Sequence, residues 1–178
     1  DYIINNISNG KILNQFNDFS ANPKFDDVKK GVKIFKEGNY NCVVAIGGGS
    51  VIDMGKLIAF YAENGIDDFY TTVSEPFSVS CPVVAIPTTA GSGSEETHFA
   101  VIYNKGVKYS VAHPSLKPTY KILIPDFAFN CLKEQKLISA LDAFCQSIES
   151  YWSKGATEES QKYSLKALTL LRFLILFD

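Results

Sequence analysis

The sequence predicts an α/β fold, with a doubly wound α/β domain over residues 1–132 and the first helices of an all-helical domain over residues 133–178. Three observations lead to this prediction. Two short apolar runs rich in β-branched residues, 42–46 and 81–87, each end in a loop of small residues, as buried parallel strands do. The first loop leads directly into a helical pattern. Beyond residue 133 the pattern is helical almost without interruption.

The elements up to the first loop follow from apolar spacing and stop signals. Asn22-Pro23 indicates a loop that leads into a helix, and residues 26–38 carry apolar side chains near helical spacing among lysines, with Gly38-Asn39 as the stop. The strand 42–46 ends at three glycines. Ser50 is then expected to be the N-cap of a helix that closes at Asn64-Gly65.

The rest of the α/β domain is more irregular. Residues 67–80 show no strong period, whereas 97–103 and 108–112 predict a hairpin around Asn104-Lys105-Gly106. Residues 121–126 predict another strand. Because of the hairpin and this further strand, the sheet is expected to be mixed at an edge. Two helices follow, over 137–152 and 158–177.

Both ends of the chain are expected to be cut. Residues 168–177 are nearly all apolar, and a helix that is apolar on every side must be buried by something. We therefore expect a missing C-terminal portion to cover it. The opening residues lack the clean strand and turn with which a doubly wound domain begins.

Composition excludes several classes of protein. The 178 residues have room for one complete core, and 46% hydrophobic and 20% charged residues are ordinary globular usage. A net charge of −2 argues against nucleic acid as a partner. We find neither an apolar run long enough for a bilayer nor the basic start of a signal peptide, and expect a cytoplasmic protein. The four cysteines are too scattered for a zinc site or a disulfide scaffold.

The glycine turn, residues 47–50, is the first motif with chemical meaning. A strand that ends in Gly-Gly-Gly-Ser and turns into a helix presents backbone N–H groups to an anion at the positive end of the helix dipole. This pattern predicts a diphosphate site and hence a Rossmann-like nucleotide-binding domain. A tight strand-to-helix corner without a ligand is the alternative.

The loop Thr88–Ser94 follows the next strand, at the carboxyl end where open α/β sheets bind ligands. Its small hydroxyl side chains can hydrogen-bond a cofactor without blocking it. Alternatively, it is a Ser/Thr-rich helix cap with Glu95 in the first turn.

Asp142 and Gln146 are four residues apart on a predicted helix, with Glu149 one turn further on, so their side-chain oxygens share one face. Such oxygens can bind a metal. A solvated helix face is the alternative.

Five segments together resemble the iron-containing, group III alcohol dehydrogenase family, in order and at suitable spacing: 16–23, 43–56, 87–95, 108–118 and 141–153. The combination of Gly-Gly-Gly-Ser-x-Ile-Asp-x-Gly-Lys with Pro-Thr-Thr-x-Gly-Ser-Gly-Ser-Glu is specific. Within the family, residues 142–153 most resemble the phosphonoacetaldehyde reductase-like branch.

The resemblance implies an N-terminal domain that binds NAD or NADP, a helical domain that holds a divalent metal, iron or zinc, and hydride transfer between nicotinamide and an aldehyde or alcohol. It assigns no catalytic residue. Eight positions match cofactor contacts: Gly48, Gly49 and Ser50 at the diphosphate, Thr88, Thr89 and Ser92 around the nicotinamide half, and Lys108 with Val101 near a ribose. Asp142 matches the first metal ligand.

Departures from the family pattern put the metal in question. The family has a histidine where this chain has Gln146, whose amide binds iron or zinc far more weakly than imidazole. Two further histidine ligands would follow residue 178, and the aspartate that selects the adenosine ribose would precede residue 1. His98 and His113 match no family ligand and are expected to be structural or on the surface.

Three functions therefore stay open. The first is an oxidoreductase that reduces a small aldehyde with NAD(P)H, and the branch resemblance suggests an aldehyde that bears a phosphonate. It needs both domains, so the 178 residues alone are expected to be inactive. The second is a relative of dehydroquinate synthase, and the third a non-catalytic nucleotide-binding module. The resemblance also implies a homodimer or larger assembly.

Overall fold

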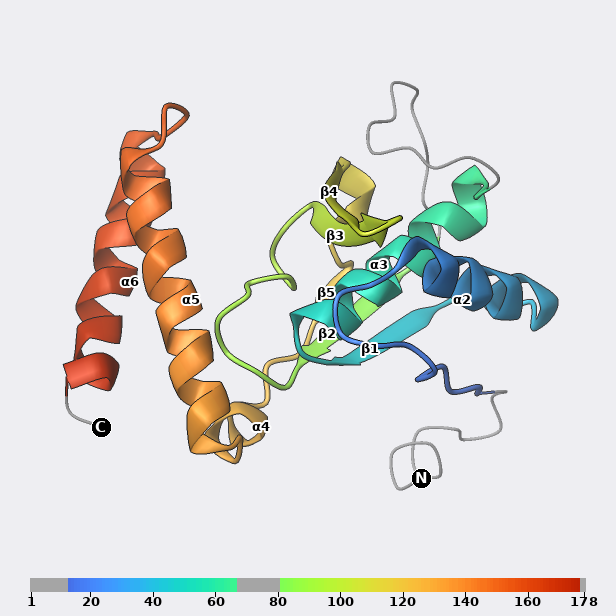
Figure 1. Ribbon diagram of the computed structural model, residues 1–178, viewed down its shortest axis with the longest axis horizontal. Coiled ribbons are helices and arrows are strands. Elements are labelled where there is room, and N and C mark those ends of the chain that lie inside the picture. Colours follow the sequence, from blue (N-terminus) through green and yellow to red (C-terminus); the bar gives the residue numbers. More distant parts are fainter. Residues whose placement is uncertain (1–12, 67–80, 177–178) are drawn as a thin grey trace.

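A computed structural model of the chain describes residues 13–66 and 81–176, with the side chains of 173–176 left out. Its elements are arranged in two parts, an α/β part and a pair of long helices joined to it through a short helix (Figure 1). In chain order they are α2 (Phe25–Glu37), β1 (Val43–Gly47), α3 (Gly49–Asn64), β2 (Val83–Pro87), β3 (Phe99–Asn104), β4 (Val107–Ala112), the 3-10 helix η1 (Pro114–Leu116), β5 (Tyr120–Lys121), α4 (Pro125–Phe129), α5 (Lys133–Trp152) and α6 (Glu158–Leu176).

The central sheet of the described chain has the order β1–β2–β5 and is parallel throughout. Val43 pairs with Val83 and Gly47 with Pro87, so β1 and β2 are in register along their whole length. This confirms the prediction that the apolar runs are strands of a parallel sheet. Because the strands end together, the loops that follow them emerge side by side.

The hairpin β3–β4 forms its own two-stranded sheet, joined by Lys105 and Gly106, whose φ angles of 51° and 79° are the positive pair that a tight hairpin turn requires. The hairpin is thus confirmed, but the expected mixed edge is wrong for the described strands. The reason is packing: Ala100 and Ile102 of β3 are buried in the cluster formed by α2 and α3, so the hairpin covers a helix and does not extend the sheet.

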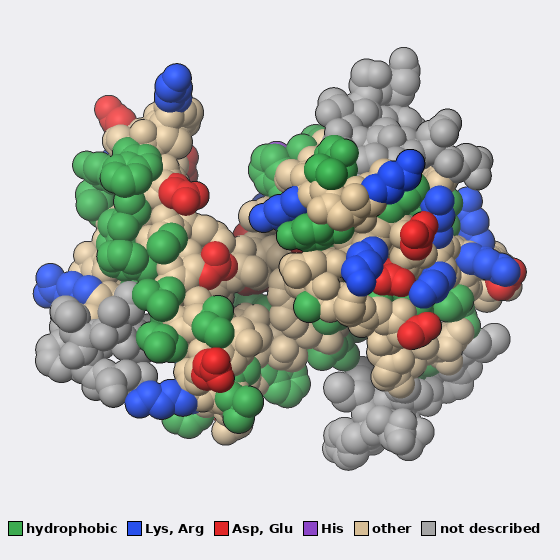
Figure 2. Space-filling view, in the orientation of Figure 1, with side chains coloured by type: hydrophobic (Ala, Val, Ile, Leu, Met, Phe, Trp, Pro, Cys, Tyr) green, Lys and Arg blue, Asp and Glu red, His purple; other side chains and the backbone are tan. Residues whose placement is uncertain are grey.

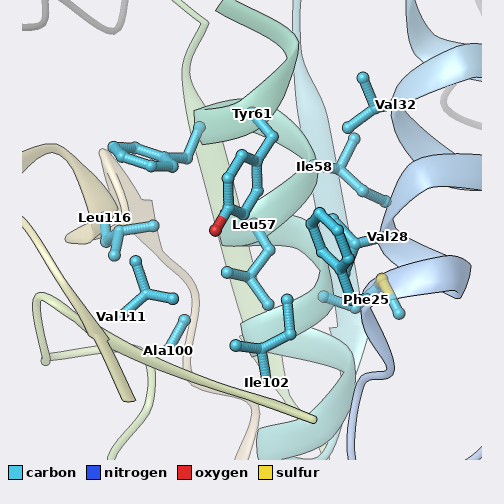
Figure 3. Packing of buried hydrophobic residues seen from close by; sticks show 12 residues of the cluster. Phe25, Val28, Val32, Leu57, Ile58, Tyr61, Ala100, Ile102, Val111 and Leu116 are labelled. Atoms are coloured by element: carbon cyan, nitrogen blue, oxygen red, sulfur yellow. The ribbon is translucent and has the colours of Figure 1, made fainter. Parts of the chain in front are cut away.

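The core is built around α3. Leu57, Ile58 and Tyr61 of this helix face residues of α2 on one side and of the hairpin on the other (Figure 3). The completely enclosed cluster includes Val28 from α2 and Ile102 from β3, both 0% exposed. Helix α3 is therefore fixed from two sides, and so is the turn at its N-terminus.

Three predicted boundaries are wrong. Gly48 and not Ser50 is the N-cap of α3, because the helix already begins at Gly49. The strand predicted over 121–126 ends at Lys121, and Pro125, favoured at a first helical position, begins α4 instead. Helix α5 begins at Lys133, four residues earlier than predicted, because its first turn is polar and gives no apolar period.

Helices α5 and α6 form an antiparallel pair (Figure 1). Large apolar side chains gather on its surface (Figure 2), among them Leu137 and Ile138 of α5, and Leu165 and Leu170 of α6, the last of these 62% exposed. The expectation that further chain covers this region stays a prediction, and Phe177 lies outside the described residues. No helix within residues 13–66 and 81–176 is both long and apolar enough to span a bilayer.

Candidate functional site

The glycine turn and the β2–β3 loop (residues 88–98) meet at the carboxyl end of the parallel sheet. The Thr88 N–H donates to the Gly47 carbonyl oxygen over 2.9 Å, which extends the strand pairing into the loops. This edge is where open α/β sheets bind ligands. The structure thus brings together the two motifs that the sequence placed at separate strand ends.

The two loops approach so closely that a side chain on the glycine turn would collide with the other loop. A Cβ built on Gly49 would lie 2.8 Å from the Ser92 Oγ, and one on Gly48 would lie 3.3 Å from the Thr89 Oγ1. All four residues are half-buried, so they are accessible from solvent. Here glycine is needed for space, since neither Gly48 nor Gly49 has a positive φ angle.

Ser50 lies in the first turn of α3 and connects the glycine turn to the segment before α2. Its Oγ accepts a hydrogen bond of 3.1 Å from the Asn22 backbone N–H, and Asn22 has a left-handed φ of 64°. The next residue, Pro23, accepts a 2.7 Å hydrogen bond from the Tyr103 N–H of β3. These contacts place three chain segments around the positive end of α3, where an anion is favoured.

A buried aspartate on α3, Asp53, accepts hydrogen bonds from both the β2–β3 loop and the hairpin. The Asp53 Oδ1 accepts a 2.5 Å hydrogen bond from the Ser94 hydroxyl, and its Oδ2 accepts one of 2.9 Å from the Val101 N–H. Asp53 and Ser94 are 9% and 6% exposed. The alternative interpretation of the loop as a helix cap is wrong, because β3 follows and Ser94 bonds to Asp53.

Lys56, one turn further along α3, completes this network. Its side chain is fully buried, and its ammonium donates to the carbonyl oxygens of Thr97 at 3.1 Å and Phe99 at 2.9 Å. The Nζ also lies 3.7 Å from the Asp53 Oδ1. Burial lowers the pKa of the Lys56 ammonium, and the neighbouring Asp53 carboxylate opposes that shift.

The sequence motifs contain Asp53, Lys56 and Ser94, and Thr97 begins the predicted hairpin, but none of the four was given an individual role from the sequence. A signal was present: an aspartate and a lysine three residues apart in an otherwise apolar stretch of helix must be buried together or exposed together. Only the position of the hairpin shows that they are buried.

Val101 and Lys108 lie diagonally opposite each other on the hairpin. Val101 pairs with Ser110 and Lys108 with Tyr103, so the two side chains share one face of the two-stranded sheet. Val101 is half-buried over Asp53, and Lys108 is exposed. That both lie near one ribose, as the resemblance implies, stays a prediction.

Helix α5 comes close to the β2–β3 loop at Gly91. A Cβ on Gly91 would lie 2.5 Å from the Ser139 carbonyl oxygen. Near it, the Cys131 thiol donates to the Thr88 carbonyl oxygen over 3.1 Å. Between the loop, α5 and α6 lies a cavity of about 520 Å³, lined by the loop residues Thr89 and Gly91 and by Gln135, Lys136 and Leu171, among others.

Asp142 and Gln146 share one exposed face of α5, as predicted, but they bond to each other. The Gln146 Nε2 donates to the Asp142 Oδ2 over 3.0 Å. Among residues 13–66 and 81–176 there is no group of three histidine, cysteine, aspartate or glutamate side chains that could hold a metal ion. One carboxylate beside an amide that acts as a donor does not fit a divalent metal, so we derive no step through a metal.

Both histidines have local roles. The His113 Nδ1 accepts a 3.2 Å hydrogen bond from the Ser115 N–H and caps η1. The His98 ring lies over Phe99, with the ring centroids 4.2 Å apart, in an exposed position. This agrees with the expectation that they are structural or on the surface.

Comparison with known proteins gives one consistent family. The model of the family described as "Iron-containing alcohol dehydrogenase" matches residues 1–125. The NAD-dependent methanol dehydrogenase of Bacillus methanolicus is 37% identical over 153 residues, 84% of this chain and 40% of the relative. The phosphonoacetaldehyde reductase of Streptomyces viridochromogenes is 35% identical over 137 residues, 71% of this chain and 35% of the relative.

A solved structure supports the same fold. The sulfoacetaldehyde reductase of Bifidobacterium kashiwanohense, in complex with NAD⁺, superimposes with a TM-score of 0.86 at 29% identity over 96% of this chain and 46% of its own. The doubly wound, Rossmann-like prediction is thereby confirmed. The matched part of the chain spans 31% to 40% of the length of these curated relatives.

Proposed function

Because this chain belongs to the iron-containing alcohol dehydrogenase family, we propose that it binds a nicotinamide dinucleotide across the glycine turn and the β2–β3 loop and serves hydride transfer between that cofactor and a small aldehyde or alcohol. The observation that carries the proposal is the contact between the two loops. Gly49 meets Ser92, and Gly48 meets Thr89, at the ligand-binding edge of the sheet.

In this proposal the diphosphate lies against Gly48, Gly49 and Ser50. The first turn of α3 supplies backbone N–H groups and the positive end of the helix dipole. The hydroxyl of Ser50 is kept in place by the Asn22 N–H. When bound, the cofactor supplies the hydride, and these residues orient it.

The nicotinamide half lies on the other side, along Thr88, Thr89 and Ser92, with Val101 and Lys108 of the hairpin at the ribose. Hydroxyl groups suit this position because they can donate or accept a hydrogen bond without filling the space. The cavity between the β2–β3 loop and α5 begins at Thr89 and would receive the carbonyl compound. We also propose that the chain divides at residues 132 and 133, where α5 begins.

We propose further that the substrate carries an anionic group. Two similar proteins are named for phosphonoacetaldehyde and sulfoacetaldehyde. In addition, Lys136 lines the cavity and offers a cation to such a group. Its Nζ lies 5.1 Å from the centroid of the exposed Phe129 ring.

Calorimetric titration of the chain with NADH and with NADPH tests the binding proposal. We expect saturable binding of one or both, lost in Gly48→Val, whose side chain would fill the space beside Thr89. Gly155→Val is the matched control, because nothing lies within 4 Å of a Cβ there. No heat from either cofactor with the folded chain would refute the proposal.

Turnover is tested on the gene product that contains this chain, at its full coding length. NADH oxidation is followed with phosphonoacetaldehyde, sulfoacetaldehyde and butyraldehyde. We expect oxidation with an aldehyde and a preference for the anionic ones, reduced in Lys136→Met. Equal rates with butyraldehyde and the anionic aldehydes would refute the substrate proposal alone.

One observation favours a second candidate function, nucleotide binding without catalysis. Gln146 donates a hydrogen bond to Asp142, and no third metal-ligating side chain joins them within the described part of the chain. Cofactor binding without oxidation of NADH by any of the three aldehydes would select this function.

A further inference from the structure

The buried pair Asp53 and Lys56 has no assigned role in cofactor binding, yet its contacts lie directly beneath the site. We propose that this pair is a positioning device. It holds the β2–β3 loop against the glycine turn, and it thereby sets the affinity for the nicotinamide half of a dinucleotide separately from the affinity for the adenosine diphosphate half. The inference rests on the proposed function.

The β2–β3 loop needs contacts from outside itself to fix its position. Residues 88–98 contain turns and bends but no helix or strand. Within it the Glu96 N–H donates to the Gly93 carbonyl oxygen, and its ends pair with other segments, Thr88 with Gly47 and His98 with His113. A segment with so little backbone pairing has few fixed positions. The Ser92 side chain of this loop nevertheless lies close to Gly49, and the Thr89 side chain lies close to Gly48.

Helix α3 supplies these contacts from its interior face. Asp53 fixes the loop at the Ser94 hydroxyl and the start of the hairpin at the Val101 N–H. Lys56 fixes the backbone between them at the carbonyls of Thr97 and Phe99. Four successive anchor points between residues 94 and 101 therefore lie on two side chains of one rigid helix.

These anchors are connected to the predicted cofactor contacts. The Ser94 N–H donates to the Ser92 Oγ over 3.4 Å, and Ser92 in turn faces Gly49. Displacing Ser94 from Asp53 therefore moves the hydroxyl that stands against the glycine turn. The turn itself is part of α3 and keeps its position.

The two halves of the cofactor site thus depend on the network to different degrees. The residues proposed for the diphosphate, Gly48 to Ser50, are joined to α3 by the chain itself. Of those proposed for the nicotinamide half, Ser92 is connected to α3 through Ser94 and Asp53, and Val101 directly through Asp53. A purely structural role of the pair would weaken both halves together, whereas a positioning role weakens one.

The test compares ADP with NADH by calorimetry, because ADP carries only the adenosine and diphosphate. Asp53→Asn places an amide N–H₂ where an acceptor is needed, and Ser94→Ala removes one anchor while the Asp53–Lys56 pair stays. In both variants we expect ADP affinity within about threefold of wild type and NADH affinity reduced about tenfold or more, since tenfold corresponds to about 1.4 kcal/mol.

Ser164→Ala is the matched control, because Ser164 is 5% exposed and donates within α6 to the Ser160 carbonyl oxygen. It should leave both affinities unchanged. Thermal unfolding of every variant shows that it is folded at the temperature of the titration, and Ser94→Ala serves if Asp53→Asn is not.

Equal weakening of ADP and NADH, or no weakening of either, would overturn the inference while the proposed function stands. If the wild-type chain binds neither ligand, the proposed function fails and the inference fails with it.

Discussion

Gly91 and Ser139 meet at the point where the β2–β3 loop touches helix α5: a Cβ on Gly91 would lie 2.5 Å from the Ser139 carbonyl oxygen. Ser139 precedes Asp142 by less than one helical turn, so this contact relates the proposed cofactor loop to the helix that carries the predicted metal ligand. The partner atom belongs to the backbone of a helix and cannot move aside as a flexible side chain can.

We expect Gly91→Ala to separate the loop from α5. The added methyl group has no space without a shift of the helix, so unfolding free energy should fall by about 1–3 kcal/mol and NADH binding should weaken. Urea unfolding and calorimetry measure the two effects. Gly155→Ala, with open space around its Cβ, should be neutral or slightly stabilising, and equal behaviour of the two variants would contradict the assigned contact.

The contact between Gly49 and Ser92 predicts a coupled pair. Gly49→Ala brings a Cβ to 2.8 Å from the Ser92 Oγ, and Ser92→Gly removes the opposing atom. The double variant should therefore be more stable than the sum of the single effects predicts, with a coupling of about 1 kcal/mol in urea unfolding. Additive effects would mean that the two loops do not touch.

Lys56 predicts a dependence of stability on alkaline pH. Because burial lowers the pKa of Lys56 below its ordinary 10.5, the unfolded chain binds more protons between those two values. The free energy of unfolding should therefore rise as the pH increases from the pKa of Lys56 in the folded chain to 10.5. The comparison is with Lys56→Met, which keeps the apolar stem and lacks the titrating group.

At neutral pH this variant should be less stable than wild type by about 1–3 kcal/mol, since Asp53 and two carbonyls lose their donor. The difference should widen as pH increases, measured by urea unfolding in a series of buffers. The wild type and Lys56→Met share all other titrating groups, including Cys81, so these groups do not contribute to the difference between them. A difference that stays constant or narrows would show that Lys56 is not desolvated.

The cysteines should differ in reactivity. Burial raises the pKa of the Cys81 thiol to about 11, whereas Cys42 and Cys145 are exposed. At about pH 8, iodoacetamide should modify the two exposed thiols first and Cys81 only after unfolding, because the thiolate is the reactive form. Mass mapping of the digested chain gives the order, and early labelling of Cys81 in the folded chain would contradict its burial.

The sequence was most informative where local chemistry decides local structure. Buried parallel strands are apolar on both faces, which led to the predicted runs 42–46 and 81–87, observed as strands over 43–47 and 83–87. A hairpin turn needs residues that accept positive φ, which led to the predicted turn at Asn104-Lys105-Gly106. The paired motifs at Gly47–Ser50 and Thr88–Ser94 also indicated the family. These features depend on neighbours in the chain.

It was least informative where distant segments compete. The hairpin was expected at the edge of the sheet, but it covers α3, because Ala100 and Ile102 gain more by burial against that helix. The strand predicted over 121–126 ends at Lys121, and Pro125 begins helix α4 instead. Ser50 was expected to cap α3, but Gly48 occupies the N-cap position and Ser50 lies within the first turn.

By itself, then, the sequence determined that the two apolar runs are strands of a parallel sheet, where the glycine turn lies, and that Asp142 and Gln146 share a helix face. Only the tertiary structure decided that Asp53 and Lys56 are buried beneath the β2–β3 loop, and that Gln146 donates to Asp142. The physical reason is that burial of a charge depends on what packs over it. The hairpin that covers Lys56 begins 43 residues later in the chain, at Phe99.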